Sequence, residues 1–323
     1  MSATSMPSPI PPPLAKPRSN PWLIAGGTAG MFILGVVIGR MLPATASAPP
    51  AAPSQAAANA ASAQTADANT VIPPDQETDP LWKKCESTDL DTKIDGCGAI
   101  IQANTETPAN LSVAYDNRGY AYHGKGQDKL AMADYEQALR LDPNDAAAYE
   151  HRGEVDLSTG NSDQAMADYD AEVRISPDAS GGYKGRGDVY SVKQDWANSL
   201  AGYNKAIELE PAYVEALAGR GAVYFVTKQF DPALADLNQA IQLNPDYELA
   251  YVTRGGVLSA QGQYAPAIAD YTHAIQLNGK DALAWYGRGI AKVKSGDQRG
   301  GAVDYVMAKQ LDPSIDGVPV TKQ

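Results

Sequence analysis

Apolar, aromatic and small side chains recur with a fixed period along the second two-thirds of the chain. Written in lines of 34 residues from residue 112, six lines fit without a gap and end at residue 315. In each line these side chains gather at positions 4, 8 and 11, and again at positions 20, 24, 27 and 28. Both sets have the three- and four-residue spacing of an amphipathic helix. The pattern therefore predicts two helices per line and six helical hairpins.

Several line positions hold nearly the same residue in every copy. Position 24 is tyrosine in five of the six lines, and position 27 is alanine in every line except the second, which has Glu172. Small residues at positions 8, 20 and 27 are predicted to let two antiparallel helices approach closely, with the tyrosines filling the space beside them. Position 8 is always glycine, namely Gly119, Gly153, Gly187, Gly221, Gly255 and Gly289.

Glycine and proline mark the expected helix ends. Position 15 is glycine in four lines, where the end of a helix favours a left-handed residue. Position 32 is proline in five lines, and the residue before a proline is disfavoured in a helix. The four glycines are Gly126, Gly160, Gly262 and Gly296.

The period and these positions resemble the tetratricopeptide repeat over residues 112–315. The resemblance implies an all-α, right-handed superhelical solenoid of antiparallel helix pairs, as in membrane-anchored bacterial members of the family. One hairpin cannot bury its apolar face alone, so stacking of neighbours makes the core. The six expected repeats are residues 112–145, 146–179, 180–213, 214–247, 248–281 and 282–315.

The family resemblance also implies a concave groove lined by the first helix of each hairpin, at about positions 2, 5, 6, 9, 12 and 13. Carried over, these positions make the first half of the groove mostly acidic and the second half mostly apolar. We therefore expect a partner segment with basic residues at one end and apolar anchors at the other. The groove residues are Asp116, Asn117, Tyr120, Glu150, Glu154, Lys184 and Asp188, then Glu215, Ala222, Phe225, Val252, Tyr286, Ile290 and Val293.

Arginine occupies position 7 in every line, and aspartate occupies position 23 in every line except the third, which has Gly202. One interpretation is a structural ion pair between the two helices of each hairpin. The other is a row of arginines that binds an anionic ligand. Because nearly every arginine has a carboxylate available, the structural interpretation is favoured.

The chain before the repeats contains an uncharged run from Trp22 to Gly39. At 1.5 Å per residue it spans roughly 27 Å, enough for a membrane anchor over residues 21–41. Lys16 and Arg18 precede it, which places the tail 1–20 in the cytoplasm and the repeats in the periplasm of an inner-membrane protein. A cleaved signal peptide with small residues near Ala46 is the competing interpretation.

Two further segments connect this run to the first repeat. Residues 42–79 are rich in Ala, Pro and Ser and are expected to form a disordered linker. Residues 80–111 are expected to form a degenerate hairpin that caps the stack. In an oxidising compartment Cys85 and Cys97 would form a disulfide worth about 3 kcal/mol; the alternative is two buried thiols.

Charge and motif content narrow the function. The net charge is −12, which disfavours nucleic-acid binding because phosphate backbones are also anionic. The sequence has no Walker-type phosphate loop, no GxSxG and no HExxH. We therefore expect a protein-binding scaffold with no catalytic residues, no cofactor and no metal site. A non-catalytic subunit of an enzyme complex and a cytoplasmic or soluble periplasmic adaptor are the alternatives.

The last repeat departs from the others. Gly300 and Gly301 stand where alanine packs elsewhere, and Lys292 occupies a mostly aromatic position. Only a short tail, residues 316–323, follows it. Either the last hairpin is frayed, or its face docks onto a partner or onto a second copy of the chain.

Overall fold

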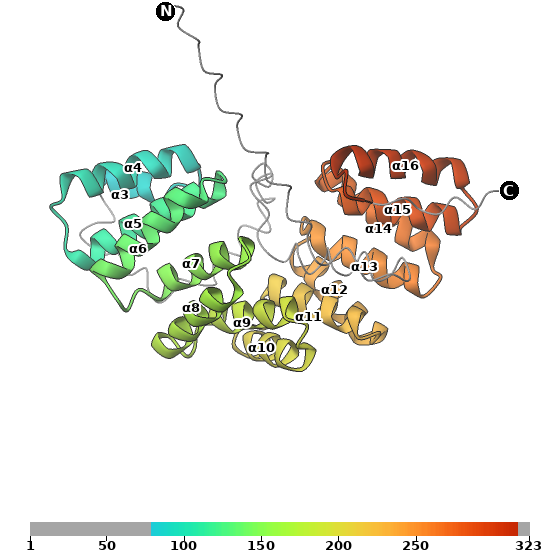
Figure 1. The fold of residues 1–323 in the computed structure, drawn as a ribbon, viewed down its shortest axis with the longest axis horizontal. Helices are drawn as coiled ribbons and strands as arrows, with labels where there is room; N and C mark the ends of the chain where they lie inside the picture. Colours follow the sequence, from blue (N-terminus) through green and yellow to red (C-terminus); the bar gives the residue numbers. More distant parts are fainter. Residues whose placement is uncertain (1–78, 316–323) are drawn as a thin grey trace, which may run out of the picture.

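The computed structural model describes residues 79–315, and this part of the chain is all helical. It holds 14 helices that follow one another around an arc, with α3 and α4 at one end and α15 and α16 at the other (Figure 1). The predicted transmembrane run, the linker up to residue 78 and the tail 316–323 lie outside the described residues. The helices are α3 (Pro80–Cys85), α4 (Leu90–Ala103), α5 (Pro108–Gly124), α6 (Asp128–Leu141), α7 (Ala146–Ser158), α8 (Ser162–Ile175), α9 (Gly181–Val192), α10 (Trp196–Leu209), α11 (Val214–Val226), α12 (Phe230–Leu243), α13 (Glu248–Ala260), α14 (Tyr264–Leu277), α15 (Ala282–Lys294) and α16 (Gln298–Leu311).

Each 34-residue line forms one helix pair, from α5–α6 to α15–α16. The two helices of a pair pack on each other, and the second helix also packs on the first helix of the next pair. The first helices α5, α7, α9, α11, α13 and α15 also contact one another in succession. They are therefore closer together than the second helices, so they form the inner side of the arc. The right-handed sense of the superhelix stays a prediction.

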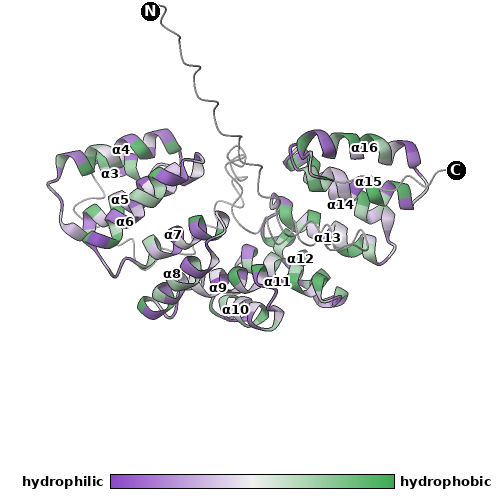
Figure 2. Ribbon diagram, in the orientation of Figure 1, coloured by the Kyte–Doolittle hydropathy of each residue, from purple (hydrophilic) through white to green (hydrophobic). Residues whose placement is uncertain are grey.

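The helices are two-faced, as the sequence periodicity predicts. Figure 2 shows hydrophobic and hydrophilic residues on every helix rather than wholly apolar helices. The buried faces are made largely of alanine and tyrosine. Tyr135, Tyr169, Tyr203 and Tyr271, all at position 24, are 1% exposed or less. Burying a ring of this size contributes roughly 2 kcal/mol per residue.

These tyrosines explain four of the six invariant glycines, namely Gly119, Gly153, Gly187 and Gly255. A Cβ added to Gly119 would lie 2.7 Å from the Tyr135 ring, closer than two carbon atoms can approach. The same ring position also contacts position 6 of the next repeat, where a Cβ at Gly219 would lie 2.6 Å from Tyr203. Repeat four has a leucine in place of the tyrosine, and the facing position 6 is then threonine instead of glycine. At this junction ring and glycine change together because they occupy the same space; at the first junction the Tyr135 ring instead lies beside His151, with the ring centroids 6.0 Å apart.

The repeated arginine and aspartate form structural ion pairs, as the favoured interpretation predicted. Arg118 holds Asp134 through two hydrogen bonds of 2.7 Å, and Asp134 is 5% exposed. The same two-bond pair recurs in repeats two, four, five and six. Such planar pairs are strong because both donors of the guanidinium are used at once. The paired arginines are thus committed to holding the two helices of their own repeat together.

Repeat three is the exception, and the reason is steric. A Cβ at Gly202 would lie 2.8 Å from the backbone oxygen of Tyr183 on the facing helix, so no aspartate fits there. Arg186 instead pairs with Asp170 of the preceding repeat, with its Nε 2.7 Å from Oδ1. This pair is much more exposed than the others.

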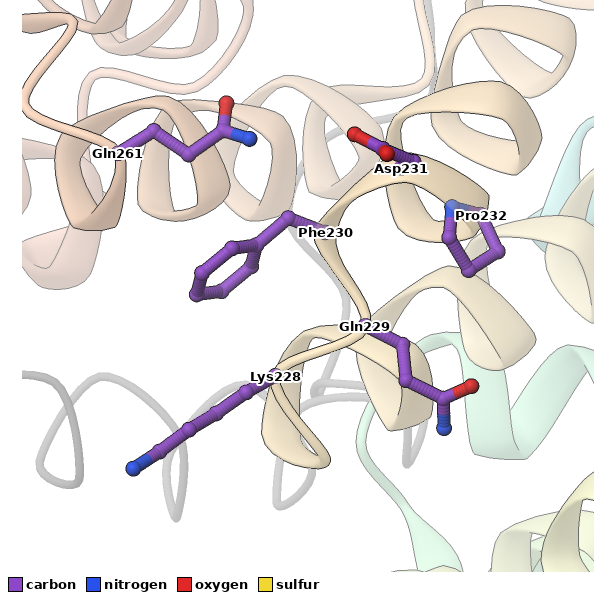
Figure 3. Close-up of a pocket in the computed structure, with 6 residues that line it drawn as sticks. All are labelled: Lys228, Gln229, Phe230, Asp231, Pro232 and Gln261. Carbon is purple, nitrogen blue, oxygen red and sulfur yellow. The ribbon is translucent and has the colours of Figure 1, made fainter.

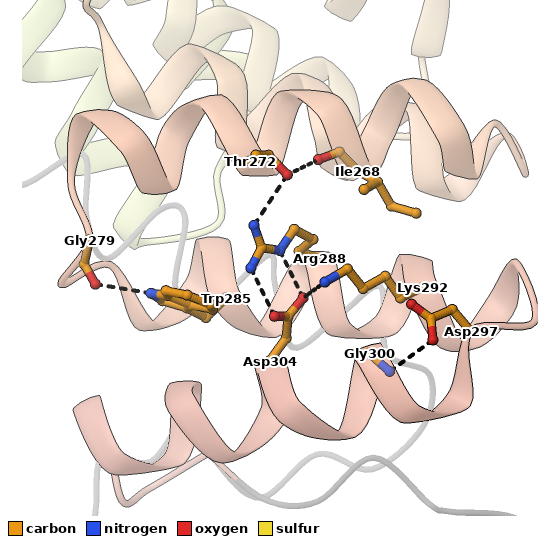
Figure 4. Close-up of polar contacts among 9 residues, drawn as sticks. All are labelled: Ile268, Thr272, Gly279, Trp285, Arg288, Lys292, Asp297, Gly300 and Asp304. Carbon is orange, nitrogen blue, oxygen red and sulfur yellow. Dashed lines mark hydrogen bonds and ion pairs between the residues drawn. The ribbon is translucent and has the colours of Figure 1, made fainter.

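The last repeat forms a complete hairpin. Its second helix α16 has 14 residues, as α14 has, so it is not frayed. Lys292 is explained by Asp304, which it contacts at 2.8 Å beside Arg288 (Figure 4). A Cβ at Gly301 would lie 2.7 Å from the Gly289 oxygen, so the two helices of this repeat need glycine where they cross.

The loop glycines adopt the backbone expected of them. Gly126, Gly160, Gly262 and Gly296 have φ between 70° and 102°. The other two repeats place Gln194 and Lys228 there, each with a φ of 59°. A side chain in this left-handed region costs about 1 kcal/mol, so these two loops are strained relative to the rest.

A disulfide closes the first described hairpin. Cys85 and Cys97 are bonded, with their Cα atoms 4.5 Å apart. Both cysteines are fully buried and pack with Trp82 and Ile100. This small cluster covers the first face of α5, which has no preceding repeat to pack against.

Candidate binding groove

The predicted groove residues lie on the first helices, which form the inner side of the arc. Asp116, Asn117 and Tyr120 are on α5, Glu150 and Glu154 on α7, and Lys184 and Asp188 on α9. The structure brings the acidic members together around two internal cations. The groove assignment itself stays a prediction.

The first of these cations is His151. Its Nδ1 lies 2.9 Å from Oδ1 of Asp116, which is 5% exposed. Burial lowers the pKa of His151, but the Asp116 carboxylate, with Glu150 and Glu154, outweighs it and raises that pKa to about 10. His151 is therefore a cation at neutral pH, and the Tyr120 ring lies 5.2 Å from its ring.

Tyr120 is the most accessible part of this cluster. Tyr120 is 45% exposed, whereas Glu150 and Glu154 are partly buried. Lys93 of α4 lies 5.6 Å from the ring centroid, and its Nζ is 3.3 Å from the Asn117 Oδ1. The capping helix α4 therefore contributes to this end of the groove.

The second internal cation is Lys184. Its Nζ lies 3.1 Å from Asp188 and 3.7 Å from Glu154. Asp188 also accepts a hydrogen bond of 2.6 Å from the Tyr203 hydroxyl. Burial lowers the pKa of Lys184, but Asp188 and the surrounding groups raise it above its usual value overall. The lysine therefore stays charged and neutralises part of the acidic cluster.

Glu172 of α8 adds a buried carboxyl behind this cluster. It is 2% exposed and accepts a hydrogen bond of 2.7 Å from the backbone N–H of Gly182. Burial, followed by the charge of Glu150, raises the pKa of Glu172 to about 9. The carboxyl is thus neutral at pH 7. The only indication of this buried carboxyl in the sequence is that Glu172 replaces the alanine found at position 27 of the other five repeats.

Two further aromatic residues border the cluster. Tyr213 and Tyr247 precede α11 and α13, at the N-cap position, where the equivalent Asp145 and Asp281 cap their helices. Burial is the main cause that raises the pKa of Tyr213; the charge of Lys184 opposes this rise, and the charges of Glu150 and Glu215 add to it. Sequence reasoning missed both tyrosines because they stand outside the groove positions of the repeat.

Comparison with known proteins agrees with this architecture. Tetratricopeptide-repeat family models match residues 119–160, 214–247 and 249–281. No curated protein matches the sequence. With the helix pairs in register over six repeats, the matches identify the family. The chain is a tetratricopeptide-repeat protein.

Solved structures share the fold of this tetratricopeptide-repeat chain at low identity. The APC/C hetero-tetramer Cut9–Hcn1 aligns with a TM-score of 0.63 and 14% identity, over 72% of this chain and 48% of that chain. A tetratricopeptide repeat protein from Parabacteroides merdae gives 0.56 and 20%, over 72% and 90%. The pilF protein of Pseudomonas aeruginosa gives 0.55 and 18%, over 64% and 95%. At these identities the likeness shows the fold.

Packing between neighbouring tetratricopeptide repeats buries most side chains of the predicted apolar half of the groove. Phe225 and Tyr286 are only 6% and 5% exposed, and Ala222 and Val252 are 1% exposed. Phe225 contacts Gly256 of the next repeat, where a Cβ would lie 3.0 Å from its ring. Of the predicted apolar anchors, Ile290 and Val293 keep an intermediate exposure. The acidic half therefore offers more accessible side chains than the apolar half.

Within residues 79–315, no group of three or more His, Cys, Asp or Glu side chains is arranged to hold a metal ion. A shallow depression lies elsewhere, between the α11–α12 loop and the end of α13 (Figure 3). It is lined by Lys228, Gln229, Phe230, Asp231, Pro232 and Gln261. None of these residues belongs to the predicted groove.

Proposed function

We propose that this protein is a protein–protein interaction scaffold of the bacterial cell envelope, which binds partner segments along the inner side of its repeat arc. The observation that carries the proposal is the cluster on α5, α7 and α9, where Tyr120 is exposed and Glu150 and Glu154 are only partly buried. Tetratricopeptide-repeat proteins generally act as non-catalytic scaffolds.

The envelope location rests on two features. The uncharged run 22–39, preceded by Lys16 and Arg18, supports a single inner-membrane anchor with a periplasmic repeat domain. It lies outside the described residues, and no helix within residues 79–315 is long and apolar enough to span a bilayer. The Cys85–Cys97 disulfide supports an oxidising compartment.

Photo-crosslinking in cells tests the scaffold role. A photoreactive amino acid is placed at Tyr120 or Glu154 in the groove, and at Ala133 on the outer helix α6 as the matched control. We expect protein adducts from the groove positions and few from Ala133. Equal labelling from both surfaces, or none from the groove, would contradict the proposal.

Charge reversal tests the acidic half of the groove. Glu150→Lys with Glu154→Lys is expected to reduce the groove adducts at least several-fold, because these side chains face the bound segment. Asp178→Lys with Asp231→Lys carries the same change in charge at exposed positions outside the predicted groove and serves as the control. Circular dichroism checks that both variants stay folded.

Location is tested separately. Reporter fusions after residue 79 distinguish a periplasmic from a cytoplasmic repeat domain. Thiol labelling of Cys85 and Cys97 in denatured, non-reducing extracts should fail in the periplasmic case, since both thiols are then oxidised. A cytoplasmic reporter signal together with two labelled thiols would overturn the envelope location and leave the scaffold role intact.

A further inference from the structure

The junction between the second and third repeats is built differently from the other junctions in the stack. At the other junctions, an alanine at position 27 faces an alanine at position 3 of the next repeat, and both are fully buried. Here the same two positions hold Glu172 and Gly182. The four alanine pairs are Ala138 and Ala148, Ala206 and Ala216, Ala240 and Ala250, and Ala274 and Ala284.

Two glycines make room for two carboxyl groups at this junction. A Cβ at Gly182 would lie 2.9 Å from Oε2 of Glu172, so the carboxyl occupies the space of the usual methyl group. A Cβ at the preceding Gly181 would clash with the carboxylate of Glu150. Glu150 is only partly buried and belongs to the groove, whereas Glu172 is buried in the wall behind it. The replacement therefore builds a pair of carboxyl groups that reaches the groove.

Hydrogen bonding inside the protein leaves part of this pair unsatisfied. Oε1 of Glu172 accepts from the Gly182 N–H, but Oε2 is buried without a hydrogen-bond partner. A buried oxygen of this kind costs roughly 1–3 kcal/mol if it stays unpaired. Capping the N-terminus of α9 takes only Oε1 of Glu172. The second oxygen, Oε2, remains available to a ligand.

The charges around Glu172 are uneven. Glu150, Glu154 and His151 face it from α7, and the Gly182 N–H faces it from α9. Residues 146–179, the repeat that supplies both carboxyl groups, hold eight acidic side chains against two arginines and the cationic His151. Residues 282–315, at the other end of the stack, hold three acidic and five basic side chains. A cationic group therefore has its strongest attraction at this junction.

We propose that Glu150 and Glu172 together bind one arginine or lysine side chain of the segment that occupies the groove. The cation pairs with the Glu150 carboxylate at the groove surface. The Glu172 carboxyl behind it then loses its proton and adds a second negative charge that attracts the cation. This site rests on the proposed function, since it assigns one contact within the same groove. It fixes the register of the segment at the junction of repeats two and three.

Ionisation of Glu172 gives the site a distinctive signature. The pKa of Glu172 is about 9 in the free protein, so at pH 8 the carboxyl carries a proton. A guanidinium placed beside it favours the ionised form and lowers that pKa. The proton leaves to the buffer as the cation binds. Exposed carboxylates elsewhere are already ionised at pH 8 and release no proton.

Titration calorimetry with full-length protein in a neutral detergent measures this release. The probe is N-acetylated tetra-arginine amide, because guanidinium groups keep their protons at this pH. Each titration is repeated at pH 8 in phosphate and in Tris, whose ionisation enthalpies differ. The difference in observed enthalpy gives the number of protons released per peptide.

Three variants accompany the wild type. Glu172→Gln removes the titrating proton. Glu172→Ala with Gly182→Ala restores the alanine pair of the other junctions and so protects against a folding defect. Asp178→Asn removes one exposed charge from the α8–α9 loop and is the matched control.

We expect wild type and Asp178→Asn to release between half a proton and one proton per peptide. Both Glu172 variants should release almost none and bind about five- to tenfold more weakly. No binding of the probe by wild type, or release that persists in both Glu172 variants, would overturn the site; persistent release would point to His151 instead. Either result leaves the crosslinking test of the scaffold role unaffected.

Discussion

The two halves of the repeat stack share one period but have different interiors. From Leu217 to Ile315 the buried residues form one continuous hydrophobic cluster. Between Trp82 and Val223 they divide into four smaller clusters, interrupted by buried polar groups such as Asp116, Asp188 and the protonated Glu172. Both halves keep the same helix pairs and the same ring-on-glycine contacts. The comparison shows that a few positions in each line are enough to fix the register of the repeat. The remaining positions can hold either apolar core residues or the residues of a polar site.

The difference also separates stability from binding. A continuous apolar core stabilises the second half by burial, and the buried aspartates Asp236, Asp270 and Asp304 there are each paired with an arginine. The first half holds buried carboxyl groups that must be paired or protonated, which lowers its stability. A disulfide at its outer end compensates in part by restricting the unfolded chain. The polar half is the one that retains accessible groove side chains.

Transplanting the polar junction into the apolar half gives the largest expected effect. Ala240→Glu places a carboxyl against Ala250, where no glycine makes room for it. We expect a loss of about 4 kcal/mol in the free energy of unfolding, from overpacking and a buried unpaired carboxyl. Urea denaturation measures it. Adding Ala250→Gly should recover part of the loss; no recovery would mean that the Glu–Gly pair is not a compensating unit.

The pH dependence of stability should reveal the polar half. Asp145, Glu172 and His151 all have raised pKa values, of about 6, 9 and 10. Each contributes stability that is fully present below its unfolded value, 3.8, 4.5 or 6.5, and is lost as the pH rises through its folded value.

Between pH 6.5 and 8.5, Glu172 and His151 therefore act in the same direction. Between pH 7 and 8 we expect the free energy of unfolding to fall by about 2.5 kcal/mol, since each of the two groups contributes nearly 1.4 kcal/mol per pH unit. Urea midpoints at several pH values test this. A stability that rises with pH in this window would contradict the protonation of both groups.

Restoring the alanine pair at the polar junction should stabilise the protein. Glu172→Ala with Gly182→Ala removes a carboxyl that must stay protonated and replaces a helical glycine. At pH 8 we expect a gain of about 2 kcal/mol, shrinking toward pH 5, where the carboxyl is protonated at little cost. Thermal denaturation at the two pH values measures the difference. An equal gain at both would show that ionisation of Glu172 plays no part.

The arginine pairs give the smallest contrast. Arg220 makes two bonds to the buried Asp236, whereas Arg186 pairs with the half-exposed Asp170. Arg220→Ala should therefore cost about 2 kcal/mol, because it leaves a buried carboxylate unpaired, and Arg186→Ala about 0.5 kcal/mol. Chemical denaturation of both variants at one pH compares them directly. Equal losses would mean that burial of the aspartate does not set the strength of the pair.

Much of the fold was readable from the chain because the repeat shows each constraint six times. Periodicity located the helix pairs, and the invariant glycines predicted the close approach of the tyrosine rings. The arginine–aspartate pairs followed from their constant spacing of 16 residues. Lys292 looked anomalous in the sequence because its partner, Asp304, already had an arginine assigned to it.

The groove was predicted less completely. Position within the repeat placed Glu150, Glu154 and Lys184 on the inner helices, but it could not say how much of each side chain stays exposed. Phe225 and Tyr286 were expected as anchors, and the packing of neighbouring helices buries them. Tyr213 and Tyr247 were missed because they occupy capping positions before the helices.

By itself, the sequence determined the register, the number of hairpins and the sites of close helix approach, because these depend on local spacing and on residue size. Tertiary structure alone decided which charges outside the repeated arginine–aspartate pairs are paired, how deeply Glu172 is buried and that Gly181 and Gly182 make room for its junction with Glu150. Burial and pKa depend on neighbours that are distant along the chain. They are settled only when one repeat packs against the next.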